Sequence, residues 1–258
     1  MTTLEWIAGK YAGIAFLAWL AGACALGWSV GRLLDERTAD PARRGRRLAG
    51  LAATGIVLFG IIATLVVTES RLVALDNTLA ETLSNHASAS WLRALATLTV
   101  AGDRDFLLVL GAFVLTGLLW RRRWVDASLW LSGTLGAAGL NVLLKGIFQR
   151  VRPEHLHGFA QELGWSFPSG HATGAMAVYG LSAYLVADAL PGPWRRSVAV
   201  AATALIASIG YSRVMLQVHF LSDVLAAFAV TGAWITLCIA LRERVLAMPP
   251  SRSATHSR

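Results

Sequence analysis

The sequence predicts an all-α polytopic membrane helix bundle, and composition, hydropathy and the spacing of apolar runs support this. Of the 258 residues, 55% are hydrophobic and 15% are charged, whereas a soluble domain carries about 25% charged residues. The mean hydropathy is +0.56. A transmembrane helix needs about 20 mostly apolar residues. Seven runs are candidate spans: Tyr11–Val30, Leu48–Val67, Phe106–Trp120, Trp124–Leu144, Ala172–Leu190, Val198–Tyr211 and Phe220–Leu241.

These runs divide the chain into three parts. Residues 1–47 form an N-terminal span and a loop, residues 48–245 form the main membrane domain, and the polar residues 246–258 form a disordered tail. Within the main domain, residues 69–104 carry leucines at helical spacing. This pattern predicts short helices lying in the membrane interface, with Trp91 at headgroup depth, or alternatively a small cap packed on the bundle.

The distribution of basic residues predicts the orientation in the membrane. The net charge is +8, which in a soluble protein would suggest a nucleic-acid partner. Here the arginines cluster between apolar runs, so they indicate topology and not nucleic-acid binding. In a seven-span layout, 15 Lys and Arg residues fall on one side and eight on the other. The positive-inside rule places the N-terminus outside and the C-terminus in the cytoplasm.

Three polar segments fall on the outer side of this layout. The first runs from Lys145 to Pro153 and follows the fourth span, and the second, Pro168-Ser-Gly-His171, opens the fifth. The third contains Ser212 and Arg213, then His219 and Asp223, and joins the last two spans. The topology did not require all three to meet at one face, so their convergence predicts a shared site.

The residue types in these segments suit a phosphate group. Lys145, Arg152 and Arg213 supply cations, and guanidinium groups match phosphate oxygens in a bidentate manner. Ser169 and Gly170 precede a helix whose free N–H groups and positive dipole end favour an anion.

The histidines and the aspartate suit a two-step displacement. His219 and Asp223 lie four residues apart on one helix face, so the carboxylate can fix the imidazole tautomer. His219 then attacks phosphorus, His171 protonates the leaving oxygen, and His171 in its basic form activates water. The cations neutralise the phosphate, so the sequence predicts no metal and no other cofactor.

The three segments resemble the motifs of the type 2 phosphatidic acid phosphatase family, K-x6-RP, PSGH and SR-x5-H-x3-D. The fixed positions of this pattern are filled by Lys145, Arg152, Pro153, Pro168, Ser169, Gly170, His171, Ser212, Arg213, His219 and Asp223. The resemblance implies metal-free hydrolysis of a phosphate ester or diphosphate through a phosphohistidine, with Ser212 among the phosphate-binding residues. The family core has six spans, so Tyr11–Val30 is interpreted as an added N-terminal helix.

Several polar residues outside this pattern receive other interpretations. Arg150 is predicted to be an interfacial anchor, and His155 and His157 are predicted to be solvated loop residues. Asp126 and Asp188 lie at cytoplasmic helix ends, where no functional role is expected.

The resulting hypothesis is a lipid phosphatase or diphosphatase of the bacterial inner membrane, with its site facing the periplasm. Among the family's substrates we favour undecaprenyl diphosphate, with phosphatidate, phosphatidylglycerol phosphate and lipid A phosphates as alternatives. A phosphotransferase with the same site, and a non-catalytic transport or binding protein, are the competing functions. A vanadium haloperoxidase is disfavoured because those relatives are soluble. The sequence leaves the oligomeric state open.

Overall fold

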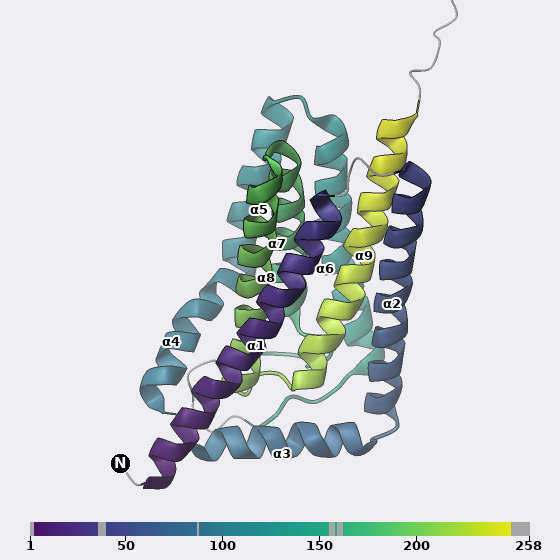
Figure 1. Ribbon diagram of the computed structural model, residues 1–258. Helices are drawn as coiled ribbons and strands as arrows, with labels where there is room; N and C mark the ends of the chain where they lie inside the picture. Colours follow the sequence, from purple (N-terminus) through teal and green to yellow (C-terminus); the bar gives the residue numbers. More distant parts are fainter. Residues whose placement is uncertain (1–2, 36–39, 87, 155–157, 159–161, 249–258) are drawn as a thin grey trace, which may run out of the picture.

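The computed structural model describes residues 3–35, 40–86, 88–154, 158 and 162–248. All regular elements in this part of the chain are helices, as the sequence predicts. Figure 1 shows the long helices side by side in a bundle, with α3 lying across one end. The elements are α1 (Thr3–Asp35), α2 (Pro41–Val67), α3 (Arg71–His86), α4 (Ala89–Thr99), the short 3-10 helix η2 (Val100–Gly102), α5 (Arg104–Trp120), α6 (Trp124–Phe148), α7 (Gly170–Ala189), α8 (Gly192–Met215) and α9 (Leu221–Ala247).

Each of the seven predicted spans is a long helix, but the helices extend beyond the apolar runs. One clear case is α8, which begins at Gly192 and ends at Met215, whereas hydropathy predicts only Val198–Tyr211. Polar and charged residues such as Arg195 and Arg213 occupy its two ends, and an apolar run therefore underestimates it. α1 and α2 likewise continue into the arginine-rich segment that joins them.

Within the described residues, five helices are long and apolar enough to cross a membrane: α1, α2, α6, α8 and α9. α5 is equally apolar but has 17 residues, so it is shorter than these five helices. α7 packs against α5, α6, α8 and α9 at the centre of the bundle. A helix surrounded by protein does not need a continuous apolar surface, so hydropathy alone is a weak guide to α7.

The centre of the bundle is packed through small residues that let helices approach closely. A Cβ atom added to Gly174 of α7 would lie 2.6 Å from Leu107 Cδ1, and one added to Gly133 of α6 would lie 2.5 Å from Leu181 Cδ1. Leu181 is fully buried beside Trp130 in the main hydrophobic core. This packing holds α5, α6 and α7 in a fixed arrangement and so fixes the helix ends that carry the polar segments.

The segment between α2 and α5 forms a cap packed on the bundle. Leu92 and Leu95 of α4 are 1% and 2% exposed, and Asp76 of α3 is 4% exposed. Trp91 does not lie free in the interface, because its ring contacts Phe16 of α1 at a centroid distance of 5.5 Å. The segment therefore packs on the bundle, and whether its helices also lie in the membrane interface stays a prediction.

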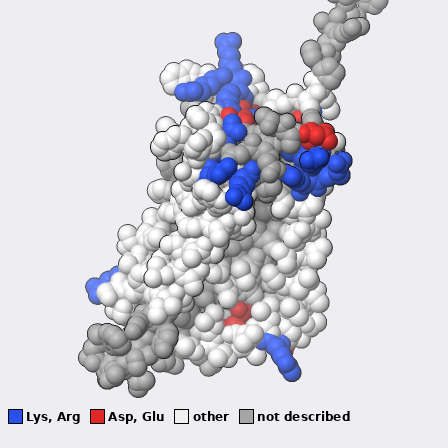
Figure 2. Space-filling model, viewed as in Figure 1, with Lys and Arg blue, Asp and Glu red and all other residues white. Residues whose placement is uncertain are grey.

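Charged residues concentrate at the ends of the molecule. In Figure 2, Lys and Arg side chains gather at the end opposite α3, and the sides of this face carry almost no charge. At that end Arg242 donates to Asp126 at 2.6 Å and to Asp188 at 3.0 Å, which ties α9 to α6 and α7. These aspartates therefore hold helices together.

Candidate active site

The three polar segments meet at the α3 end of the bundle and are joined through their backbones. Ser166 N donates to Arg150 O at 2.8 Å, and Ser169 N donates to Asp223 O at 3.2 Å. The α8–α9 loop closes on itself, since His219 N donates to Arg213 O at 3.2 Å. The predicted convergence of the segments is therefore present in the fold.

His219 is buried beside Asp223, as the four-residue spacing predicts. The two side chains are 2% and 0% exposed, and His219 Nδ1 lies 3.4 Å from Asp223 Oδ2. Arg152 Nη1 lies 3.1 Å from His219 Nε2. A guanidinium can only donate, so Nε2 carries the lone pair and the ring proton lies on Nδ1. This tautomer leaves Nε2 as the nucleophilic atom.

Burial lowers the pKa of His219 to about 4, although the hydrogen bond and charge of Asp223 oppose that effect. The imidazole is therefore uncharged at neutral pH, as a nucleophile must be.

Asp223 is held by a buried network that contains Arg150. Arg150 Nη1 donates to Asp223 Oδ1 at 2.6 Å and to Ser222 Oγ at 2.7 Å, and Arg150 Nη2 donates to Asp76 Oδ2 at 2.9 Å. The other Asp223 oxygen accepts hydrogen bonds from Ser166 Oγ and from the backbone N–H of residue 220. The sequence interpretation of Arg150 as an interfacial anchor is therefore wrong, because its side chain is 10% exposed and its guanidinium contacts Asp223.

The predicted cations lie around the loop between α8 and α9. Arg213 is 1% exposed and donates to Thr99 Oγ1 at 3.0 Å and to Glu162. Arg152 also donates to Val218 O at 2.7 Å, and Lys145 Nζ donates to the carbonyl of Trp165.

Two buried polar atoms point to a ligand of this site. Arg213 Nε and Ser169 Oγ are buried and have no hydrogen-bond partner among the described residues. Ser169 is the N-cap of α7 but makes no capping bond through its side chain. A Cβ atom added to Gly170 would meet only Asn141 Oδ1 at 3.8 Å, so protein packing does not demand glycine there. An anion bound at the α7 N-terminus would satisfy these donors.

His171 is held by a residue that the sequence reasoning missed. His171 Nε2 lies 2.6 Å from Asp103 Oδ1, and Nδ1 lies 3.5 Å from Glu162 Oε1. Gly102 lets η2 come this close, because a Cβ atom there would lie 3.2 Å from His171 Cδ2 and 2.6 Å from Ile209 Cγ2. Each of the two histidines therefore has an aspartate beside it.

Glu162 lies between the predicted phosphate-binding residue Arg213 and the predicted general acid His171, since its Oε1 contacts both. Burial alone would raise the pKa of Glu162, but the charges of Arg213 and His171 outweigh burial and hold that pKa below its usual range. The carboxylate is therefore ionised at neutral pH.

Sequence reasoning missed Asp76, Asp103 and Glu162, which lie far from the motifs or in an irregular loop. The sequence did contain one indication that the two aspartates belong to the site. Asp76 and Asp103 fall in the outer segment 69–104, next to the face where the motifs converge.

The remaining predictions have mixed outcomes. Ser212 Oγ donates to Ile209 O at 2.6 Å, which is a bond within α8, so nothing in the geometry supports its predicted contact with phosphate. His155 and His157 lie outside the described residues.

No group of three His, Cys, Asp or Glu side chains suited to a metal converges within the described part of the chain. The absence of a metal stays a prediction that EDTA can test.

Known proteins resemble this chain in sequence and in the arrangement of helices. Residues 127–246 match the PAP2 superfamily. Over 142 residues the chain is 35% identical to phosphatidylglycerophosphatase B of Bacillus subtilis strain 168, covering 54% of this chain and 70% of that protein. The chain belongs to the PAP2 superfamily. The type 2 phosphatidic acid phosphatase resemblance is thereby confirmed.

Two further relatives agree with this assignment. The crystal structure of a transmembrane PAP2 type phosphatidylglycerolphosphate phosphatase from Bacillus subtilis superposes with a TM-score of 0.68 at 27% identity, covering 76% of this chain and 99% of that one. A lipid A 1-phosphatase of Rhizobium johnstonii is 36% identical over 127 residues, which is 46% of this chain and about half (48%) of that protein. This PAP2 protein is an integral membrane phosphatase that acts on lipid phosphates.

Proposed function

We propose that the chain hydrolyses a lipid phosphomonoester or diphosphate through a phosphohistidine on His219. One observation carries this proposal: a buried imidazole whose Nε2 is unprotonated lies 3.1 Å from Arg152, in the loop that follows Arg213 at the end of α8. The site faces the periplasmic side of a bacterial inner membrane in this proposal. The arginine-rich end of the bundle then lies in the cytoplasm.

In the first step, His219 Nε2 donates its lone pair to phosphorus and the bond from phosphorus to the leaving oxygen breaks. Arg152, Arg213 and the N-terminus of α7 stabilise the charge on the other phosphate oxygens. His171 gives its proton to the leaving oxygen, so the lipid alcohol departs neutral when the substrate is a monoester. Asp223 stabilises the positive charge that develops on the His219 ring.

In the second step, water replaces the imidazole on phosphorus. His171, now uncharged, takes a proton from the attacking water, and the bond from phosphorus to Nε2 breaks. Inorganic phosphate and neutral His219 result. An acceptor alcohol in place of water would make the same site a phosphotransferase.

For the substrate, the comparisons favour a phosphate monoester on a glycerophospholipid. Phosphatidylglycerophosphatase B of Bacillus subtilis and the superposed structure are both named for phosphatidylglycerol phosphate. We therefore place phosphatidylglycerol phosphate first. Hydrolysis of undecaprenyl diphosphate remains a prediction from the sequence. It rests on the fact that a periplasmic site suits recycling of that carrier.

Phosphate release by the detergent-purified protein tests this proposal. The substrates are phosphatidylglycerol phosphate, undecaprenyl diphosphate, phosphatidate and lipid A 1-phosphate, each with EDTA, beside His219→Ala. We expect EDTA-resistant release of inorganic phosphate that is lost in the variant, and the ranking of kcat/KM names the substrate. Release that needs a metal, or that survives the loss of His219, would contradict the mechanism. Phosphate recovered on added glycerol in place of water would indicate a transferase.

A further inference from the structure

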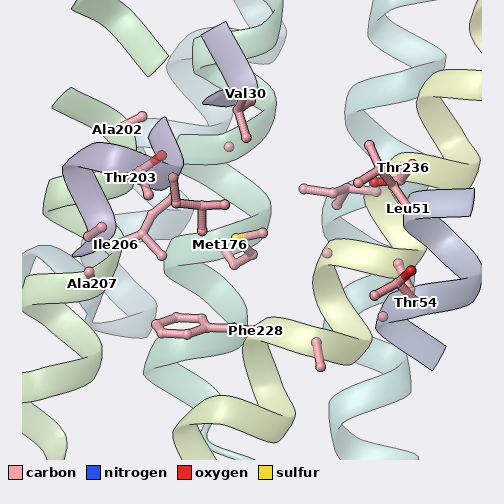
Figure 3. A pocket seen from close by; sticks show the side chains of 18 of the residues that line it. Val30, Leu51, Thr54, Met176, Ala202, Thr203, Ile206, Ala207, Phe228 and Thr236 are labelled. Atoms are coloured by element: carbon pink, nitrogen blue, oxygen red, sulfur yellow. The ribbon is translucent and has the colours of Figure 1, made fainter. Parts of the chain in front are cut away.

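A large apolar cavity lies between the two N-terminal helices, away from the catalytic residues. α1 packs along α8 and α2 packs along α9, so α1 and α2 stand on opposite sides of a space floored by α7, α8 and α9. Figure 3 shows Val30 on one side, Leu51 and Thr54 on the other, and Met176 and Phe228 in the floor. The cavity measures about 920 Å³, at the upper end of the roughly 300–1,000 Å³ of small-ligand sites.

The walls of this groove suit hydrocarbon chains. Several polar groups in these walls already have partners inside the protein: Thr54 Oγ1 donates to Gly50 O at 2.9 Å and Thr203 Oγ1 donates to Ala199 O at 2.8 Å. Trp19 Nε1 likewise donates to Ala207 O at 2.9 Å. These three groups have given their hydrogens to backbone carbonyls and offer no donor to a polar ligand, whereas an acyl chain needs none.

One end of the groove carries positive charge. Arg44 and Arg47 both line it, and Arg43 and Arg46 lie beside them at the start of α2. Glu243 of α9 accepts a hydrogen bond from Arg44 Nε at 2.5 Å and so holds that guanidinium at the mouth of the groove. Figure 2 shows Lys and Arg gathered at this end of the bundle. Basic groups between membrane helices recognise anionic lipid headgroups.

The length of the groove fits a lipid anchored at the arginines. On α2 the lining runs from Arg44 to Ile62, about 27 Å at 1.5 Å per residue. The chains of one leaflet span only about half of a 30 Å hydrocarbon core. A lipid whose headgroup meets Arg44 and Arg47 would therefore keep its chains between α1 and α2 throughout.

We propose that this groove binds a glycerophospholipid with an anionic phosphodiester headgroup, taken from the leaflet at the arginine-rich end. This lipid is not the substrate, because the catalytic residues lie at the opposite end of the bundle and a phosphodiester has no terminal phosphate to release. The N-terminal helix α1 then serves as one wall of a lipid site. The proposal stands independently of the proposed catalytic mechanism.

Native mass spectrometry of the full chain in detergent tests the proposal. The probes are phosphatidylglycerol and phosphatidylcholine with matched acyl chains. Gly22 lines the groove, and a Cβ atom there would meet nothing within 4 Å, so Gly22→Trp starts from open space and places an indole in the groove. Gly13 on the same helix also has open space around its Cβ position but does not line the groove, so Gly13→Trp is the matched control. Arg47→Gln tests headgroup selection, and His219→Ala tests whether the catalytic site holds the lipid.

We expect wild type, Gly13→Trp and His219→Ala to retain phosphatidylglycerol in preference to phosphatidylcholine. Gly22→Trp should weaken that binding by at least about tenfold, and Arg47→Gln should reduce the preference by about fivefold. Equal retention by Gly22→Trp and wild type would overturn the proposal. Loss of the lipid in His219→Ala alone would also overturn the proposal, because that result would place the lipid in the catalytic site. Equal binding of the two lipids, or a dimer that Gly22→Trp dissociates, would overturn it as well.

Discussion

Arg150 Nη1 donates a hydrogen bond to Asp223 Oδ1 across 2.6 Å, and the same guanidinium reaches Asp76 on α3 at 2.9 Å. Asp76 also accepts from Ser222 N at 3.2 Å and from Ser222 Oγ. The cap helix α3 is therefore connected to the aspartate that orients His219. Asp223 depends on residues outside the sequence motifs for its position.

Replacement of Arg150 by Met should lower kcat by about 10²-fold with a smaller change in KM, because a small displacement of a catalytic group has an effect of this size. The measurement is steady-state hydrolysis of the preferred lipid. Arg93→Met is the matched control, since Arg93 is exposed on the neighbouring helix α4.

Loss of one member of a buried ion pair costs about 3–5 kcal/mol, so Arg150→Met can also unfold the protein. Arg150→Lys keeps the charge but not the fork that bridges Asp76 and Asp223, and it should fold while still losing kcat. Full activity in folded Arg150→Lys would show that the bridge does not position Asp223.

Asp103→Asn should slow formation of the phosphoenzyme by about 10- to 100-fold, because Asp103 holds the ring of the general acid His171. The measurement is a single-turnover reaction with a lipid monoester. With p-nitrophenyl phosphate, whose leaving group departs without help from an acid, the loss should be much smaller. An equal loss on both substrates would indicate a structural role for Asp103.

Glu162→Gln should strengthen inhibition by inorganic phosphate by about tenfold, because a carboxylate beside Arg213 repels an incoming anion. The inhibition constant is measured beside that of Glu154→Gln, which removes an exposed charge from the same loop. Weaker phosphate inhibition in Glu162→Gln would mean that Glu162 assists anion binding.

The low pKa of His219 predicts how stability depends on pH. Because its pKa is about 4 in the folded protein against 6.5 ordinarily, the unfolded chain binds more protons between these values. The group therefore contributes stability above pH 6.5, and that contribution is lost as the pH falls towards 4, by up to roughly 3 kcal/mol. The midpoint of thermal unfolding should fall over this range more steeply in wild type than in His219→Gln. Parallel curves for the two proteins would contradict the assignment.

The sequence predicted the helical bundle and the three motif segments because hydropathy and fixed spacings are local signals. It predicted His219 beside Asp223, which the structure shows, but not for the expected reason: His219 precedes α9, which begins at Leu221, and the α8–α9 loop brings it to Asp223. It could not foresee that Asp103 meets His171 or that Asp76 meets Arg150, because these pairs are 68 and 74 residues apart. The extent of α8 was also hidden, because its polar ends interrupt the apolar run. The groove beside α1 depends on how whole helices pack, which no local pattern reports.

The most direct test of the central claim is to trap the phosphoenzyme. Protein is mixed with lipid carrying a labelled terminal phosphate, quenched in alkali, which preserves phosphohistidine, and digested to map the label. The label should lie on His219 and be absent from His219→Ala. With labelled p-nitrophenyl phosphate, whose leaving group needs no acid, the label should accumulate in His171→Ala, because that variant slows only the second step. Label on another residue, or hydrolysis with no labelled protein under any of these conditions, would contradict the account.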